Sequence, residues 1–177
     1  MELISPERFD ALNEALQLMH FGFRALVHGP DEELARHGLG RAQHRLLYFI
    51  ARRPGQSVQE LGARLAVTRQ ALHEALRPLA AGGFVRTQPA ADDRRRRLVA
   101  LTPAGEALEA SLSGSQRALL AAVFDQAGAE AEAGWRAVMA ALAHLLPSPA
   151  DAPPGGDDAP DERARPRARR SRAPRQS

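Results

Sequence analysis

The stretch from Ala90 to Gly105 reads A-A-D-D-R-R-R-R-L-V-A-L-T-P-A-G. An acidic pair is followed by four arginines, and a short apolar segment comes next. Thr102-Pro103 then begins a helix, because threonine favours the N-cap and proline the first helical position. Arginines at a turn between strands add little to a core but reach phosphates or a groove well. The stretch therefore predicts a basic β-hairpin with strands at residues 84–88 and 97–101.

Two short helices are predicted directly before this hairpin. The first begins at Ser57-Val58-Gln59-Glu60, a capping box in which the serine and glutamate side chains bind each other's free amides. The second runs from Arg69 to about Ala81, with Thr68 as its N-cap and Gly82-Gly83 at its end. Pro78 is expected to disturb its last turn. Helix, turn, helix and basic hairpin form the pattern of a winged helix-turn-helix.

Longer helices are predicted on both sides of this module. Residues 7–28 carry one apolar stripe, which Gly29-Pro30 is expected to end before a short helix at 31–37. A helix over 41–52 leads into the module, and its inward residues are predicted to be Ala42, Leu46, Leu47 and Ile50. After the hairpin, one helix carries the stripe Leu108, Leu112, Leu119 and Val123. Gly128 separates it from a last helix that includes Trp135, Val138, Met139, Leu142, Leu145 and Leu146.

The apolar stripes of these outer helices suggest a homodimer. They flank a small middle module, and a symmetric dimer would explain why two long apolar helices accompany so small a module. Packing of each stripe on its own module is the alternative. We therefore predict a mainly α fold with a small β-hairpin wing, divided into N-terminal dimerisation helices (1–40), a winged helix-turn-helix (41–105), C-terminal dimerisation helices (106–146) and a tail (147–177). The tail is rich in arginine and proline and is expected to be disordered.

Charge is strongly segregated along the chain. Residues 41–105 hold 12 arginines and 4 acidic residues, whereas residues 1–40 and 106–146 together hold 5 arginines and 12 acidic residues. The tail, residues 147–177, holds 7 arginines and 5 acidic residues. A positive middle between acidic ends is typical of a module that binds a polyanion.

Composition excludes several other classes of protein. The chain has no cysteine, which removes disulfides, thiolate zinc sites and thiol sensors. Its six histidines form no H-x-x-x-H pair, and no nucleophile elbow, P-loop or dinucleotide turn occurs. Neither an enzyme nor a metal or other cofactor is expected. No apolar run is long enough for a membrane span, and the first residues, M-E-L-I-S-P-E-R, lack the basic and apolar regions of an export signal, so we expect a cytoplasmic protein.

The predicted second helix presents a polar face. Arg69, His73 and Arg77 follow at i, i+4 and i+8, opposite the leucines, and Gln70 lies beside them. Arginine and glutamine pair with guanine and adenine edges in the major groove. Arginines of the run 94–97 suit a narrow minor groove, and Asp92 or Asp93 is placed to clamp one guanidinium. The alternatives are an ordinary solvated helix face and a merely soluble loop.

The segment from Asp93 to Gly105 resembles the D-x-R…V-x-L-T-x-x-G wing signature of MarR-type transcriptional regulators. The resemblance covers roughly residues 7–146 and is sharpest over 57–105; Pro78 and the arginine-rich tail depart from it, and Pro78 puts the geometry of Arg77 in question. It implies a homodimer with interlocking terminal helices on a pseudo-palindromic double-stranded DNA operator. It also implies that Asp93 orients Arg95 toward the minor groove. The predicted DNA contacts are Ser57, Thr68, Arg69, Gln70, His73, Arg77, Asp93, Arg94, Arg95 and Arg96.

An effector site is a further prediction. Many members of the family that the sequence resembles respond to phenolic or aromatic acids. Here His20 and Arg24 on the first helix, and His44 and Tyr48 on the helix over 41–52, mix cations with aromatic rings. Such a mixture suits a small aromatic carboxylate or phenol. The alternative is that these side chains serve interface hydrogen bonds and the core.

These patterns predict a sequence-specific transcriptional regulator. The expected mode is repression, released when an aromatic acid or phenol shifts the two recognition helices away from the spacing of about 34 Å that successive major grooves require. One alternative is a non-specific architectural DNA-binding protein that relies on wing and tail arginines. Another is a protein-interaction module that reuses the fold.

Overall fold

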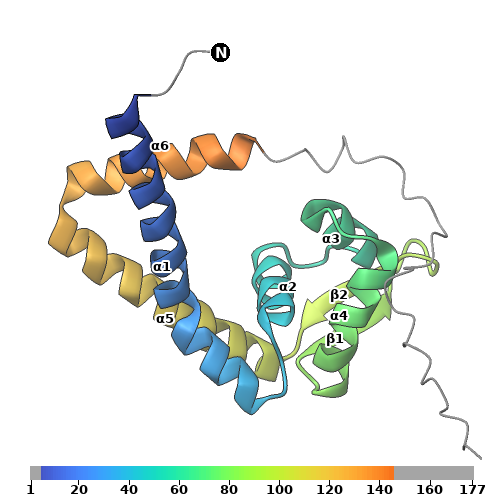
Figure 1. The fold of residues 1–177 in the computed structure, drawn as a ribbon. Coiled ribbons are helices and arrows are strands. Elements are labelled where there is room, and N and C mark those ends of the chain that lie inside the picture. Colours follow the sequence, from blue (N-terminus) through green and yellow to red (C-terminus); the bar gives the residue numbers. More distant parts are fainter. Residues whose placement is uncertain (1–4, 146–177) are drawn as a thin grey trace, which may run out of the picture.

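The computed structural model describes residues 5–145 of the 177-residue chain. Three long helices form one side of the described part, and three shorter helices with a two-stranded hairpin form the other (Figure 1). This arrangement confirms the predicted fold class. The expected tail at 147–177 and Leu146 lie outside the described residues. The elements are α1 (Pro6–Arg36), α2 (Arg41–Arg52), α3 (Val58–Leu65), α4 (Arg69–Ala81), β1 (Val85–Pro89), β2 (Arg97–Leu101), α5 (Pro103–Ala127) and α6 (Ala129–His144).

One apolar core joins α2, α3, α4, the hairpin and the first turns of α5. Leu34, near the end of α1, is the contribution of that long helix to this cluster. Ala42 is exposed in the first turn of α2, so its predicted inward position is wrong, whereas Leu46, Leu47 and Ile50 are buried as predicted. The other buried members are Leu61, Leu72, Leu76, Leu79, Val85, Val99, Leu101, Leu108 and Leu112.

Helix α1 continues through Gly29-Pro30, so the predicted stop at that pair is wrong. Proline has no amide, and the carbonyl of Leu26 therefore loses its usual helical donor. The side chain of Gln116 on α5 donates to this carbonyl from 3.3 Å. Pro30 is itself buried with Val27 and Leu34. Packing against α5 thus supplies both the burial and the hydrogen bond that keep the helix intact.

The helix ends follow the predicted signals. The hydroxyls of Ser57, Thr68 and Thr102 each accept a hydrogen bond from a backbone amide three residues on. Gly128 separates α5 from α6, as predicted. The first turn of α5 also packs closely on the start of the hairpin, where a Cβ at Gly105 would overlap the carbonyl oxygen of Phe84. Only glycine fits this approach, which accounts for the last residue of the wing signature.

The hairpin is attached to the start of α3. Strands β1 and β2 pair antiparallel, with Val85 opposite Leu101, and β1 begins one residue later than predicted. Ser57 forms a bridge to Leu98, and the amide of Val99 donates to the carbonyl of Gln56 at 3.1 Å. These bonds place the basic turn beside the helix-turn-helix.

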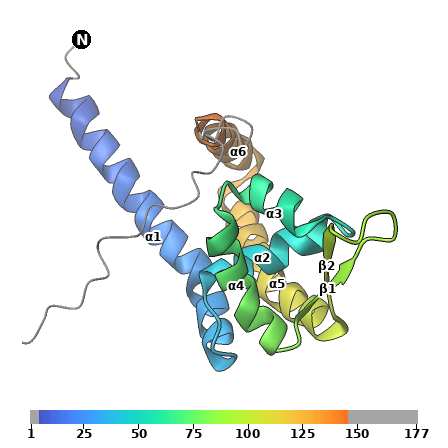
Figure 2. The same cartoon turned by 90° about the vertical axis from the view of Figure 1, so that its right-hand side faces the viewer.

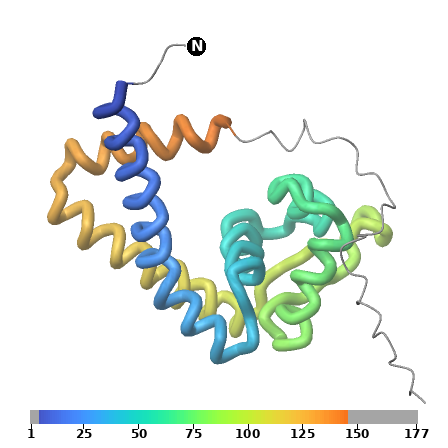
Figure 3. The backbone as a smooth tube through the Cα atoms, in the orientation of Figure 1, coloured from blue at the N-terminus to red at the C-terminus, as the bar shows by residue number. Residues whose placement is uncertain are grey.

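In the view of Figure 2, the first half of α1 projects from the rest of the described chain, and in the view of Figure 3 the same half crosses α6 in projection. Residues 5–25 are all exposed, including apolar side chains on that helix. Among residues 5–145, no helix is both long and apolar enough to cross a bilayer.

Candidate nucleic-acid interface

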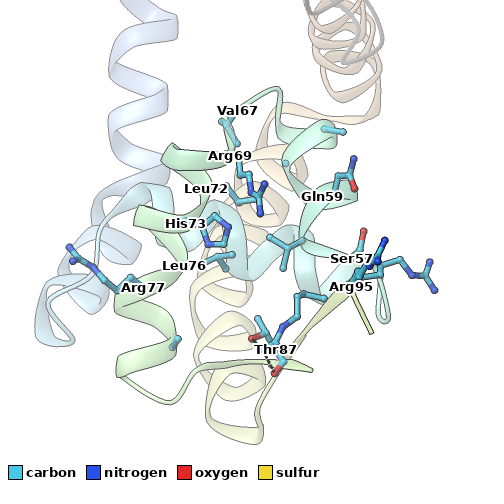
Figure 4. A pocket seen from close by; sticks show the side chains of 16 residues that line it. Ser57, Gln59, Val67, Arg69, Leu72, His73, Leu76, Arg77, Thr87 and Arg95 are labelled. Atoms are coloured by element: carbon cyan, nitrogen blue, oxygen red, sulfur yellow. Dashed lines mark hydrogen bonds between the residues drawn. The ribbon is translucent and has the colours of Figure 1, made fainter. Parts of the chain in front are cut away.

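A groove with a volume of about 940 Å³ runs between α4 on one side and α3 with the hairpin on the other. Figure 4 shows Arg69 and His73 on the α4 side, and Gln59 and Arg95 across from them. Five arginines and one histidine line the groove, and none of its lining residues is acidic. The arginines are Arg69, Arg77, Arg95, Arg96 and Arg97.

Helix α4 owes the orientation of its polar face to its buried side. Leu72, Leu76 and Leu79 are buried, so the opposite side of the helix points away from the core. The helix is continuous through Pro78, which leaves Arg77 in a helical position at the edge of the groove, pointing outward in Figure 4. Gln70 is exposed but does not line the groove, and its side-chain amide donates to Glu74 at 3.1 Å.

The start of α3 forms the opposite wall. The Ser57 hydroxyl accepts from the Glu60 amide at 3.1 Å, and the Glu60 carboxylate accepts from the Ser57 amide at 2.6 Å. This bond to the Ser57 amide lowers the pKa of the Glu60 carboxyl. Ser57 is buried and its hydroxyl caps α3, so its main role in the groove is to hold the start of α3 in place. Gln59, next along the helix, is exposed and lines the groove.

The wing turn is organised by its two aspartates. Asp93 accepts from the backbone amide of Arg95 at 2.9 Å, while the Asp92 carboxylate binds the Arg96 guanidinium at 3.0 Å. Hydrogen bonds from its own backbone amide and from Arg96 lower the pKa of Asp92. The predicted guanidinium clamp is therefore formed by Asp92 on Arg96, whereas Asp93 fixes the backbone. Arg97 donates to the Thr87 hydroxyl at 3.1 Å.

The structure gathers six of the ten predicted DNA contacts in this groove. These are Ser57, Arg69, His73, Arg77, Arg95 and Arg96. The other four are exposed nearby in the helix-turn-helix or the wing, outside the groove lining: Thr68, Gln70, Asp93 and Arg94. Arg97, which belongs to the predicted basic run 94–97, also lines the groove, whereas sequence reasoning missed Gln59 and Thr87 as polar lining residues. The pairing of β1 with β2, in which Thr87 lies opposite Val99 and Pro89 opposite Arg97, puts Thr87 and Arg97 on one face of the hairpin, and the bridge from Leu98 to Ser57 holds the hairpin beside α3.

A second cavity, of about 610 Å³, lies between α1, α2 and α5. Arg24 lines it as the only one of the four predicted effector residues, together with Phe21, Ala25, His28, Asp31, Arg41 and Leu119. Arg41 binds Asp31 through two guanidinium nitrogens at 2.6–3.0 Å. Hydrogen bonding to Arg41 lowers the pKa of the Asp31 carboxyl.

The remaining predicted effector residues face other neighbours. His20 packs edge-on against Phe21, with ring centroids 5.3 Å apart. Tyr48 lies under the Arg52 guanidinium, which is 4.2 Å from its ring centroid and also binds Glu109 at 2.9 Å. His44 is half-buried, and desolvation lowers its pKa although the nearby carboxylates of Glu109 and Asp31 raise it. Neither His44 nor Tyr48 lines the cavity.

Solved structures show where this fold occurs. A MarR family transcription regulator, SP03579, superimposes with a TM-score of 0.65 at 24% identity, covering 78% of this chain and 92% of that one. The S. aureus MepR–DNA complex superimposes with a TM-score of 0.61 at 17% identity, covering 73% of this chain and 96% of the MepR chain. NadR in complex with 4-hydroxyphenylacetate superimposes with a TM-score of 0.58 at 22% identity, covering 72% of this chain and 91% of the NadR chain.

Sequence comparison identifies a relative with higher sequence identity than these solved structures. The HTH-type transcriptional regulator PetP of Rhodobacter capsulatus is 38% identical over 133 residues, which span 75% of this chain and 80% of PetP. The profile of the MarR family matches residues 37–96, the helix-turn-helix and most of the wing. The chain therefore belongs to the MarR family of DNA-binding transcriptional regulators.

Proposed function

We propose that this regulator is a sequence-specific repressor that binds a pseudo-palindromic operator as a homodimer and is released by a small aromatic acid or phenol. The observation that carries the proposal is the groove between α4 and the wing. Its five arginines and one histidine, without a carboxylate in the lining, form a surface suited to the phosphates and base edges of a duplex.

The groove and wing suggest how the duplex is held. Helix α4 would enter the major groove, with Arg69 and His73 toward base edges and Gln59 on the α3 wall toward the backbone. The wing would bring Arg95 to the adjacent minor groove, where the potential is more negative. The division into dimerisation helices (1–40 and 106–146) and a DNA-binding module (41–105) belongs to the same proposal.

Exposed apolar surface supports the homodimer. Fourteen large apolar side chains are exposed in the described chain, and all but Tyr48 lie on α1, α5, α6 or the C-cap of α6. Exposed apolar side chains gathered on three helices in this way are typical of an interaction surface. The members on the outer helices are Phe9, Leu12, Leu16, Leu18, Met19, Phe21, Phe23, Leu119, Val123, Trp135, Val138, Leu142 and Leu145.

The cavity between α1, α2 and α5 supports an anionic aromatic effector. Arg24 offers a guanidinium group to an anion and Phe21 offers a ring, while Arg41 lines the same cavity bound to Asp31. The solved NadR complex holds 4-hydroxyphenylacetate, a ligand of this chemistry, on the same fold. Because the cavity joins α2 to the outer helices, an effector there would change how the DNA-binding module sits on the dimer.

A gel shift with the gene's own upstream intergenic DNA tests the proposal. We expect the operator to bind on the order of 10³-fold more tightly than random duplex at physiological salt. Removal of residues 147–177 should leave this preference intact. Equal affinity for both duplexes would favour the architectural alternative, and so would a preference that collapses without the tail.

The effector half of the proposal has its own test. We expect 4-hydroxyphenylacetate or a related aromatic acid to release the operator, and Arg24→Ala to blunt that release while operator affinity stays unchanged. An Arg24→Ala protein that still responds fully would remove this residue from the effector site.

A further inference from the structure

The acidic residues of the DNA-binding module have different partners. Residues 41–105 contain four: Glu60, Asp92, Asp93 and Glu74. Glu60 accepts from the Ser57 amide, Asp92 binds the Arg96 guanidinium, and Asp93 accepts from the Arg95 amide. Each of these three carboxylates has a local task in a cap or in the wing turn. Within the described chain, the Glu74 carboxylate has one hydrogen-bond partner, the neutral side-chain amide of Gln70 at 3.1 Å.

Glu74 also lies where a carboxylate is costly. It is exposed on the side of α4 opposite Leu72 and Leu79, which faces outward from the core and lies outside the lining of the groove. A negative charge on that side is repelled by the phosphates of any duplex that α4 enters. This repulsion is offset only where the duplex presents a donor to the carboxylate. In the major groove, the donor that glutamate pairs with is the amino group of cytosine N4.

The hydrogen bond to Glu74 fixes the Gln70 side chain as well. An ionised carboxylate can only accept, so the amide nitrogen of Gln70 must face Glu74. The amide then keeps one N–H and its carbonyl oxygen available. These are the groups with which glutamine binds adenine N7 and N6.

We propose that Glu74 is a specificity-determining residue that selects cytosine in the major groove and orients Gln70 to read a neighbouring adenine. The inference rests on the proposed function, because it requires α4 to lie against base edges. Glu74 lowers affinity for every duplex and recovers the loss only at a site with cytosine in the correct position. Glu74 and Gln70 together therefore increase the difference in affinity between the operator and random DNA.

The test compares the full-length protein with its Glu74→Gln, Glu74→Ala and Gln70→Ala variants on a set of operators, each with one base pair changed. Fluorescence anisotropy gives the affinity for each duplex and for random DNA. Both residues are exposed, so we expect unchanged melting temperatures. Glu130→Gln on α6 is the matched control, because it removes the same charge from an exposed site outside the module.

We expect Glu74→Ala to abolish discrimination of about tenfold at one C·G pair and to raise affinity for random DNA about two- to threefold. Gln70→Ala should lose discrimination at a neighbouring A·T pair. Loss at the same base pair in both variants would show that Glu74 acts only on Gln70 and would overturn the cytosine assignment. A uniform change across all duplexes would also overturn it.

Failure of the proposed function gives a different result. A wild-type protein that binds operator and random DNA equally would overturn the repressor proposal together with this inference. A wild-type protein with a clear preference, kept in full by Glu74→Ala, would overturn this inference alone.

Discussion

The wing arginines differ in what holds them. Arg96 is bound by Asp92, and Arg97 donates to Thr87. For Arg95 the bond is at the backbone, where Asp93 accepts from its amide. Within residues 5–145 the Arg95 guanidinium has no hydrogen-bond partner, so its position is set while its charged end stays available to a ligand.

Replacement of Arg95 by alanine is therefore expected to weaken operator binding with little effect on stability. One lost minor-groove or phosphate contact should cost about 1–2 kcal/mol of binding free energy, roughly five- to thirtyfold in affinity. Anisotropy and thermal melting measure the two effects. Arg36→Ala, at the end of α1 and outside the groove, is the charge-matched control. A steep fall in melting temperature would make Arg95 a structural residue instead.

His44 gives the protein a pH dependence of stability. Desolvation lowers its pKa in the folded state from the ordinary value of 6.5, so the unfolded chain binds the proton more readily. The stability contributed by keeping His44 neutral is therefore fully present above about pH 6.5. It is lost as the pH falls from there through the lower pKa of the folded state. We expect the wild-type melting temperature to fall more than that of His44→Gln between pH 7.5 and pH 5.5, by about 1–3 °C. Parallel pH profiles would argue against this role.

At the scale of elements, α1 depends on a contact made by another helix. Pro30 leaves the Leu26 carbonyl without its helical donor, and Gln116 on α5 replaces that donor. The same bond ties α1 to α5 where the core meets the outer helices. Its strength can be separated from side-chain packing, because a Pro30→Ala substitution would restore the backbone amide.

Gln116→Ala is expected to cost about 1 kcal/mol of unfolding free energy in the wild-type protein. In a Pro30→Ala background the cost should fall close to zero, because the restored backbone amide at position 30 would then donate to the Leu26 carbonyl. Chemical denaturation of the four proteins in this double-mutant cycle measures the coupling. Equal costs in both backgrounds would mean that the Gln116 bond contributes nothing through this carbonyl.

Sequence signals were sufficient wherever the determinant is local. The caps at Ser57, Thr68 and Thr102 and the break at Gly128 depend on residues within one turn, and the hairpin pairs two neighbouring segments, so all were predictable. The continuity of α1 through Pro30 was not, because it requires Gln116, far away in the sequence. Ala42 was misplaced for the same reason, since the first turn of α2 lies outside the core.

The candidate site follows the same division. Six predicted contacts meet in the groove. They could be predicted because the caps, the polar face of α4 and the arginine run of the wing are each visible in the sequence. Gln59, Thr87 and Arg97 join them only through the packing of the hairpin on the start of α3. In the second cavity, Arg24 and His28 lie four residues apart on α1, whereas Arg41 joins them from α2, which no helical spacing connects to them.

At the scale of the whole molecule, the outer helices separate from the DNA-binding module in charge and in burial. Residues 41–105 are strongly basic, whereas the flanking helical segments are acidic. The first turns of α1 are exposed on every side, and α6 has no buried residue. The homodimer that we propose would cover these surfaces with a second copy of the chain.

Analytical ultracentrifugation checks this arrangement. We expect a dimer at micromolar concentration, and we expect Leu142→Asp on α6 to shift it to monomer, because a charge would be buried in an apolar interface. Gln88→Asp, which adds the same charge on the exposed side of the hairpin, should leave the dimer intact. A wild-type monomer at that concentration would contradict the assembly.

Hydroxyl-radical footprinting of the full-length protein on its operator tests most directly whether the groove between α4 and the wing holds the duplex. We predict two protected regions centred about 34–36 Å apart along the helix axis, one for each recognition helix of the dimer. Arg95→Ala should lose protection of the sugars that flank the minor grooves and keep protection of the backbone beside the two recognition helices. Continuous protection without a repeat, or a footprint that Arg95→Ala leaves unchanged, would contradict the assignment of this groove to DNA.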